Sequence, residues 1–218
     1  MRRIEDILAI SAERKGSVEA VLGNLDPPKS AEEIAAIPDD RWLAEMTRAI
    51  FQAGFNWKIV DQMWPGFESA FHGFDPGWCS HIEDERFDTL VGDPAIVRHA
   101  QKIRSVADNA RFVTGKAGFG AWVAGFGPDR YADLLLAMKA EGARLGGTTG
   151  QYFLRFRGVD SWILSRDVSA RLIAEGVVDA VTPSKKTALA IQAAFSDWRA
   201  QSGYSLKQIS RILATSTG

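Results

Sequence analysis

The fold is first indicated by the stretch Gly147-Thr148-Thr149-Gly150-Gln151-Tyr152, which is followed after a short helical pattern by Gly158-Val159-Asp160-Ser161-Trp162. Gly146 and Gly147 predict the end of one helix and a reversal of the backbone. The next helix then begins with a turn whose amides have no partner inside the helix. Such amides bind phosphate oxygens without a basic side chain, but the same hairpin also joins packed helices that bind nothing.

The sequence on both sides of this hairpin predicts helices of modest length with short connections. Pro38-Asp39-Asp40 starts a helix with an apolar face, and Asp93-Pro94 starts another long one. The glycine-rich segment 115–128 is predicted to be a loop, and the second helix of the hairpin is predicted over 151–157. No segment shows the alternation of a strand, so the predicted fold class is all-α.

Length and charge limit the possibilities further. With 218 residues, 46% of them hydrophobic, the chain can bury one sizeable core. We expect a single two-lobed domain over residues 1–218. The formal net charge of −1 excludes the strongly basic surface that many nucleic-acid-binding proteins carry, so a DNA-binding surface would have to be local.

Cysteine and histidine are scarce. The single cysteine, Cys79, excludes an intramolecular disulfide, and with only three histidines it cannot form a zinc site with several cysteines. We therefore expect no metal and no cofactor. No apolar stretch approaches the roughly 20 residues of a membrane span, which predicts a cytoplasmic protein.

Four blocks of residues agree in order and spacing with one known family. They are Phe51-Gln52-Ala53-Gly54-Phe55-Asn56-Trp57, Phe71-His72-Gly73-Phe74-Asp75-Pro76, the segment from Ile96 to Arg111, and Gly147-Thr148-Thr149 with Tyr152. Together they resemble the DNA-3-methyladenine glycosylase I family, within the wider helix-hairpin-helix DNA glycosylase superfamily. The resemblance is strongest over residues 42–171, with the hairpin at 145–158, and it does not extend to residues 1–36.

The resemblance implies two α-helical lobes around a central cleft, into which a damaged nucleotide is flipped out of the duplex. It implies a monofunctional glycosylase that hydrolyses the N-glycosidic bond of an alkylated purine, with 3-methyladenine as the expected base. Its partner would be double-stranded DNA with alkylated bases, in base-excision repair, and its location nucleoid-associated. The alternative is a noncatalytic protein that binds damaged or unusual DNA with a degenerate pocket. A third possibility, a helical scaffold unrelated to DNA, also remains open.

The resemblance also implies which residues form the base pocket. Trp57 stands at the family's stacking tryptophan, although a tryptophan in such a segment can equally belong to the core. The family has a base-reading acid eight positions before it, and this chain has Ala49 there. Glu45 lies one turn earlier on the same helical face and is a possible replacement. The remaining candidates for the pocket are Phe51, Gln52 and Tyr152.

Asp160 is the candidate catalytic residue, because Val159-Asp160-Ser161-Trp162 resembles a segment that supplies a catalytic aspartate in the wider superfamily. Its carboxylate would stabilise positive charge on the sugar. The alternative is that Asp160 caps the helix directly after it. Glu45 and Asp167 are the other candidate acids, and Asp167 is otherwise expected to pair with Arg166 or Arg171.

The remaining predictions concern the absence of lyase activity, the absence of zinc and the contacts to the DNA backbone. Gln151 stands where lyases of the superfamily carry their Schiff-base lysine, so no lyase activity is expected. The family's zinc-holding cysteines and histidines are missing, so no structural zinc is expected. The predicted contacts to DNA phosphates are Gly147, Thr148, Thr149, Lys102 and Arg104.

Overall fold

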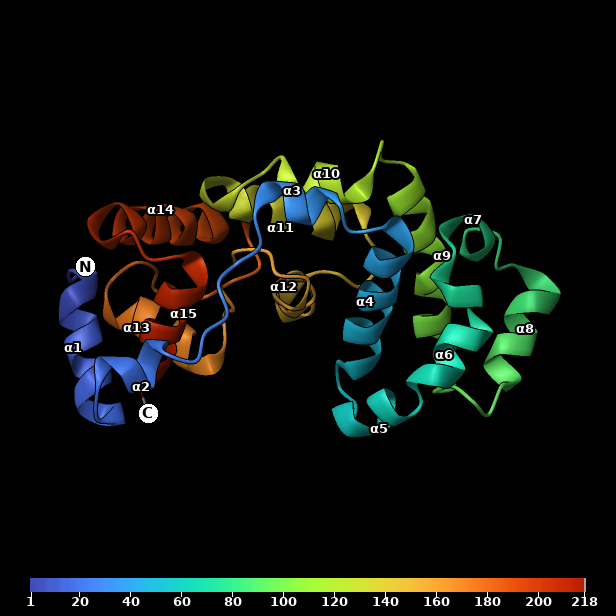
Figure 1. Ribbon diagram of the computed structural model, residues 1–218, viewed down its shortest axis with the longest axis horizontal. Coiled ribbons are helices and arrows are strands. Elements are labelled where there is room, and N and C mark those ends of the chain that lie inside the picture. Colours follow the sequence, from blue (N-terminus) through green and yellow to red (C-terminus); the bar gives the residue numbers. More distant parts are fainter. Residues whose placement is uncertain (218) are drawn as a thin grey trace. The chain divides into compact units, whose positions relative to one another are not determined.

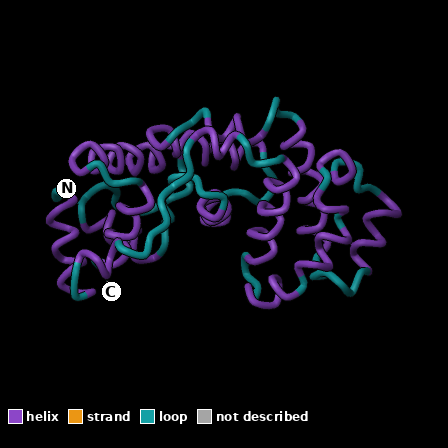
Figure 2. The backbone as a smooth tube through the Cα atoms, in the orientation of Figure 1, coloured by secondary structure: helices purple, strands orange, loops and turns teal. Residues whose placement is uncertain are grey.

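A computed structural model describes residues 1–217, and helices are the only regular elements among them (Figures 1 and 2). The predicted all-α class is confirmed. The chain forms two compact units, of which unit 1 comprises Met1–Lys29, Phe126–Leu136 and the chain from Gly158 on, and unit 2 comprises Ser30–Gly125 and Ala137–Arg157. That the units act as one domain with a central cleft stays a prediction.

Unit 2 contains the matched sequence blocks. Its helices are α3 (Ala31–Ala35), α4 (Asp39–Gln52), α5 (Trp57–Gln62), α6 (Trp64–Ala70), η1 (His72–Phe74), α7 (Pro76–Cys79), α8 (Asp84–Gly92), α9 (Ala100–Thr114), α10 (Phe119–Ala124) and α12 (Gly147–Phe156). The long helices α4 and α9 pack against each other, and α12 packs against α4. This packing places the hairpin helix beside the helix that carries Glu45 and Ala49.

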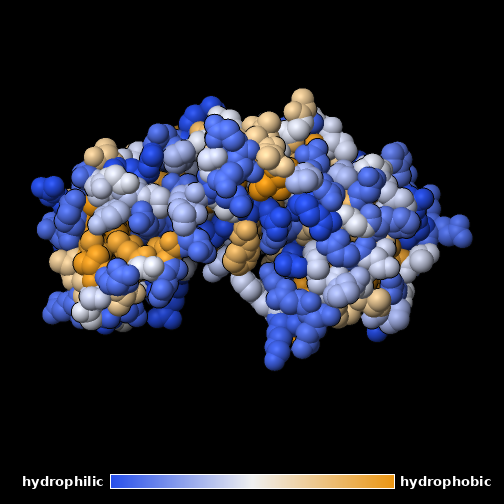
Figure 3. Space-filling model, in the orientation of Figure 1, coloured by the Kyte–Doolittle hydropathy of each residue, from blue (hydrophilic) through white to orange (hydrophobic). Residues whose placement is uncertain are grey.

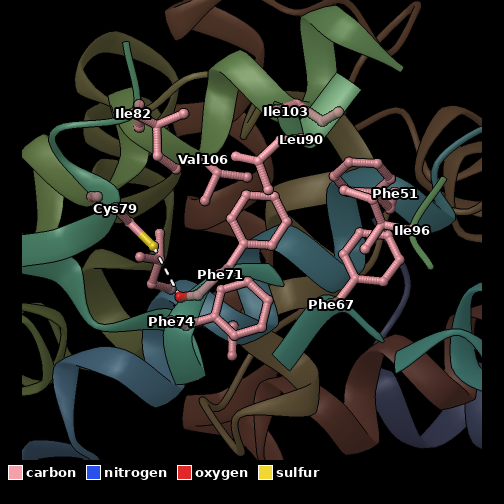
Figure 4. Packing of buried hydrophobic residues seen from close by; sticks show 14 of the residues in the cluster. Phe51, Phe67, Phe71, Phe74, Cys79, Ile82, Leu90, Ile96, Ile103 and Val106 are labelled. Carbon is pink, nitrogen blue, oxygen red and sulfur yellow. Dashed lines mark hydrogen bonds between the residues drawn. The ribbon is translucent and has the colours of Figure 1, made fainter. Parts of the chain in front are cut away.

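Aromatic side chains fill the core of unit 2. Phe51 and Phe67 meet edge to face with ring centroids 4.8 Å apart, and Phe71 and Phe74 stack beside them, as Figure 4 shows. Cys79 belongs to the same cluster, and its thiol donates to the Phe71 carbonyl. Burial, with a smaller contribution from Asp75, raises the pKa of the Cys79 thiol to about 12. Because reactive cysteines are exposed thiolates, Cys79 is a core residue.

Unit 1 holds the N-terminal residues that do not resemble the family. Its helices are α1 (Ile4–Lys15), α2 (Val18–Leu22), η2 (Pro128–Arg130), α13 (Arg166–Ala174), α14 (Lys185–Ser202) and α15 (Leu206–Thr215), while α11 (Tyr131–Glu141) continues from unit 1 into unit 2. α1 packs against α15. The backbone amide and the guanidinium of Arg2 both donate to the buried carboxylate of Glu175, and Trp198 donates to the Arg2 carbonyl. The N-terminal segment is therefore part of this unit's packing.

Three helix boundaries differ from the sequence-based prediction. α10 lies inside the segment predicted as a loop. Gly120 lets this helix pack closely on α3, since a Cβ there would lie 2.6 Å from the Ile34 carbonyl oxygen. α9 begins at Ala100, where the His99 side chain caps it, rather than at Asp93-Pro94. α12 begins at Gly147, a full turn before the predicted Gln151.

On the face seen in Figure 3, hydrophilic residues predominate and hydrophobic ones gather in small groups. Large apolar side chains with more than two fifths of their surface exposed are therefore informative wherever several occur together. In unit 2 these are Phe55, Trp57, Ile59 and Phe156.

Candidate functional site

Three aromatic side chains of unit 2 form an exposed cluster, which we call the aromatic set: Trp57, Tyr152 and Phe156. Trp57 is the first residue of α5, and its ring meets the ring of Tyr152 at 5.5 Å and 90°, and that of Phe156 at 6.0 Å and 84°. Trp57 and Phe156 expose 43% and 48% of their surfaces. The structure thus brings together Trp57 and Tyr152, two of the predicted pocket residues, and leaves aromatic surface free for stacking.

Glu45, Ala49 and Gln52 lie on one face of α4, because their spacing of four and three residues matches the helical period. All three are buried, with 5 to 6% of their surfaces exposed. The Glu45 carboxylate accepts a hydrogen bond from Arg157 at 2.5 Å, so an arginine at the end of α12 balances its charge. That Glu45 reads a base in place of the missing acid stays a prediction, and this pairing makes it less available for that role.

Two of the predicted contact residues lie inside unit 2 instead of at its surface. Phe51 of α4, a predicted pocket residue, is fully buried against Phe67 in the aromatic core, so the expectation that it lines an open base pocket is corrected. Lys102 is 3% exposed, and its ammonium donates to the carbonyls of Phe51 and Ala53 at the end of α4. Desolvation, with a smaller effect of Arg144, lowers the pKa of Lys102 to about 8. The expectation that Lys102 meets a DNA phosphate is thus corrected: the side chain holds the end of α4.

The hairpin before α12 has the glycine geometry that its sequence predicts. Gly147 has a φ of +61°, which favours glycine, and Gly150 requires glycine because a Cβ there would lie 2.2 Å from the Leu145 carbonyl oxygen. Asn109 of α9 holds the turn, since its side-chain amide donates to the Ala143 carbonyl and accepts from the Ala143 amide. The hairpin is therefore a fixed structure.

The other predicted contacts to the DNA backbone do not all lie together. Gly147 and Thr148 are exposed at the tip of the hairpin. Thr149 lines a hollow of about 360 Å³ together with Ile50, Ala53, Arg144 and Gly146. Arg104 lies elsewhere, over the ring of Phe87, in a hollow of about 460 Å³ between α8 and α9. Arg104 is thus not grouped with the hairpin residues.

Asp160 and Asp167 belong to unit 1, whereas the aromatic set belongs to unit 2. The two carboxylate oxygens of Asp160 accept the amides of Leu206 and Lys207 at 3.1 and 2.9 Å. Asp160 therefore caps α15, and the sequence-based alternative that it caps the following helix is wrong, because residues 161–165 are not helical. Asp167 lies in the first turn of α13, and Arg171 pairs with Glu175 instead of with Asp167.

Within residues 1–217 no group of three or more His, Cys, Asp or Glu side chains is placed to hold a metal ion. In the same part of the chain, no helix is both long and apolar enough to cross a membrane.

Two residues near the aromatic set do not belong to any of the sequence motifs. The sequence offers Arg157 only as a candidate cation for a DNA phosphate, whereas the structure pairs it with Glu45. Asp61 lies four residues after Trp57 on α5 and accepts a hydrogen bond from Gln52 at 3.1 Å. The four-residue spacing is a signal that could have identified Asp61 from the sequence alone.

Comparison with known proteins supports the resemblance seen in the sequence. The family model described as methyladenine glycosylase matches residues 35–127. The DNA-3-methyladenine glycosylase 1 of Escherichia coli (strain K12) is 37% identical over 60 residues, which are 28% of this chain and 32% of that protein. The chain thus matches about a third of the length of this curated relative.

A solved structure, a crystal structure of 3-methyladenine DNA glycosylase I, gives a TM-score of 0.51 at 22% sequence identity. The similarity covers 64% of this chain and 86% of the other, and it shows that the fold is shared. The resemblance to the DNA-3-methyladenine glycosylase I family is confirmed, and the matched residues 35–127 include Trp57 and the face of α4 beside it.

Proposed function

Because residues 35–127 carry the sequence of the methyladenine glycosylase family, we propose that this protein is a monofunctional DNA glycosylase. It hydrolyses the N-glycosidic bond of an alkylated purine in double-stranded DNA, with 3-methyladenine as the base. Such an enzyme acts in base-excision repair and associates with the nucleoid. We propose no Schiff-base step, because the buried side-chain amide of Gln151 is not a nucleophile.

The observation that carries this proposal is the aromatic set. A nucleotide can reach an active site only after it leaves the base stack, and an exposed aromatic surface compensates for the stacking that it loses. Trp57 offers such a surface within the family-matched region, and Tyr152 and Phe156 hold its ring from the side of α12. A flipped purine would stack on Trp57.

The chemistry needs little acid catalysis. A purine methylated at N3 is positively charged in DNA, so the base leaves as a neutral molecule with the electron pair of the bond to C1′. Water forms the new bond to C1′ and gives its proton to solvent. The step that needs help is the positive charge that develops on the sugar, and a fixed carboxylate stabilises such a charge. We assign this role to Asp160, because two backbone amides fix its carboxylate.

The hairpin is proposed to hold a DNA phosphate through the amides at the start of α12. Replacing Gly147 by valine is expected to weaken binding to all DNA sequences alike, by about tenfold, because a branched side chain blocks close backbone approach. Fluorescence anisotropy with two unrelated duplexes measures the effect.

The matched control is Gly203→Val. Gly203 ends α14 with a φ of +74° and, like Gly147, has open space where a Cβ would lie. Both variants carry a similar backbone strain, so the melting temperature should fall by a similar amount in each. If the two variants bind DNA with equal affinity, the hairpin does not contact the DNA backbone.

A noncatalytic binder of damaged or unusual DNA is the second candidate. It is favoured by one observation, that Ala49 supplies no acid and the nearest buried carboxylate, Glu45, is neutralised by Arg157. Chromatography of bases released from methylated duplex DNA separates the two functions. An enzyme releases 3-methyladenine and leaves an unbroken abasic strand, whereas a binder retains the DNA and releases nothing.

A further inference from the structure

The carboxylate of Asp61 lies beside Trp57, the residue proposed to stack on the flipped base. Asp61 follows Trp57 by four residues on α5, so the two side chains lie on the same side of this helix with their Cβ atoms about 5–6 Å apart. Both reach solvent: Trp57 exposes 43% of its surface, and the Asp61 side chain exposes 52%. A ligand that stacks on Trp57 would therefore have Asp61 near its edge.

Asp61 is held in place by α4. The side-chain amide of Gln52 donates to Asp61 Oδ1 at 3.1 Å, and Arg48 Nε lies 3.9 Å from the same oxygen. Gln52 is 5% exposed, so the buried amide fixes the carboxylate that it touches. Both contacts use Oδ1, and a carboxylate can accept about four hydrogen bonds in all. Asp61 thus keeps acceptor capacity for a ligand.

The other carboxylates of this region are bound more completely. Glu45 is 5% exposed and paired with Arg157. Glu68 accepts hydrogen bonds from two nitrogens of Arg41 and from the indole nitrogen of Trp64. Asp61 alone among these three combines a fixed position with a half-exposed side chain.

We propose that Asp61 is a specificity-determining residue that accepts an N–H from a positively charged, planar purine stacked on Trp57. An aromatic face and a carboxylate at its edge are together complementary to a flat cation with N–H donors, since both interactions favour positive charge. A neutral purine would gain the stacking but less from the carboxylate. The inference rests on the proposed glycosylase function and adds the residue that recognises the positive charge of the base.

The position of Asp61 also accounts for Ala49. Ala49 and Gln52 are three residues apart on one face of α4, and Gln52 bonds to Asp61. In this proposal, the neighbouring helix α5 supplies through Asp61 the carboxylate that α4 lacks at Ala49. Trp57, Gln52 and Asp61 then form one recognition unit from two helices.

The test is single-turnover release of 3-methyladenine from methylated duplex DNA by the wild type, Asp61→Asn and Asp88→Asn. Asparagine keeps the size of Asp61 and an oxygen for Gln52, but it removes the charge. Asp88 is an exposed acid on α8 and serves as the matched control. Release by Asp61→Asn should be about 10- to 100-fold slower, the effect of one hydrogen bond to a charged group, and Asp88→Asn should match the wild type.

A second measurement separates recognition of the base from binding of DNA. A duplex with a tetrahydrofuran abasic analogue offers no base, so the wild type and Asp61→Asn should bind it with equal affinity. Equal rates of base release by the wild type and Asp61→Asn would overturn this inference and leave the glycosylase function intact. Equal losses of base release and of abasic-duplex affinity would also overturn it. If the wild type itself releases no base, the proposed function fails, and with it this extension.

Discussion

Replacing Asp160 by asparagine is expected to slow base release in single turnover by about 10²–10³-fold, the usual cost of removing one positioned electrostatic group from an active site. The carboxylate is fixed by the amides of Leu206 and Lys207, so it needs no reorganisation when positive charge develops on the sugar. Asparagine keeps one oxygen acceptor and the same size but loses the charge. DNA affinity is expected to change far less than the rate.

The cap that Asp160 provides for α15 offers a competing explanation, and Ser205→Ala separates the two. Ser205 is the N-cap of the same helix and forms a capping box with Gln208. Its loss should cost about 1 kcal/mol of stability, similar to the loss of a cap at Asp160, without removing a charge. If Asp160→Asn and Ser205→Ala melt alike and release base at the wild-type rate, Asp160 is only a cap, and Glu45 and Asp167 become the acids to test.

Replacing Trp57 by alanine is expected to reduce base release by about 10- to 100-fold at subsaturating DNA, because base–aromatic stacking is worth about 1–3 kcal/mol. The defect should lie in capture of the flipped base. A duplex with 2-aminopurine opposite or beside the lesion reports this step directly, since the fluorescence rises when the stack opens.

Trp78→Ala is the matched control for Trp57→Ala. Trp78 is also a partly exposed tryptophan of unit 2, but it stacks on His72 and lies under Arg86, outside the aromatic set. Its loss should leave base release and the flipping signal unchanged. The same defect in both variants would show a general loss of structure, and the stacking role of Trp57 would have to be given up.

The sequence predicts those features that depend on local chemistry. The glycines of the hairpin indicated the turn before α12, because a positive φ is a property of a residue and its neighbours. The proximity of Trp57 and Tyr152 was implied only by the resemblance to the family, since the two residues lie far apart in the sequence. The start of α9 could not be placed in this way, since Asp93 caps only a turn, in which it accepts the amide of Ala95, and the helix begins after His99.

Features that depend on packing were not predictable. Nothing in the local sequence around Lys102 indicates that it is buried. Its side chain is nevertheless buried, because its ammonium donates to two carbonyls at the end of α4. Arg157 likewise has no local partner, and only the packing of α12 on α4 brings it to Glu45. Asp160 caps a helix that begins some 45 residues later, a pairing that no local pattern indicates.

The most direct test of the proposed function is base release by the unmodified protein, with enzyme in excess over lesions. Duplex DNA methylated to contain 3-methyladenine is incubated with the protein, and the bases released are separated by chromatography. The glycosylase function predicts free 3-methyladenine in the soluble fraction and strands that break only after treatment with alkali. No released base, while a known glycosylase acts on the same DNA, would contradict it.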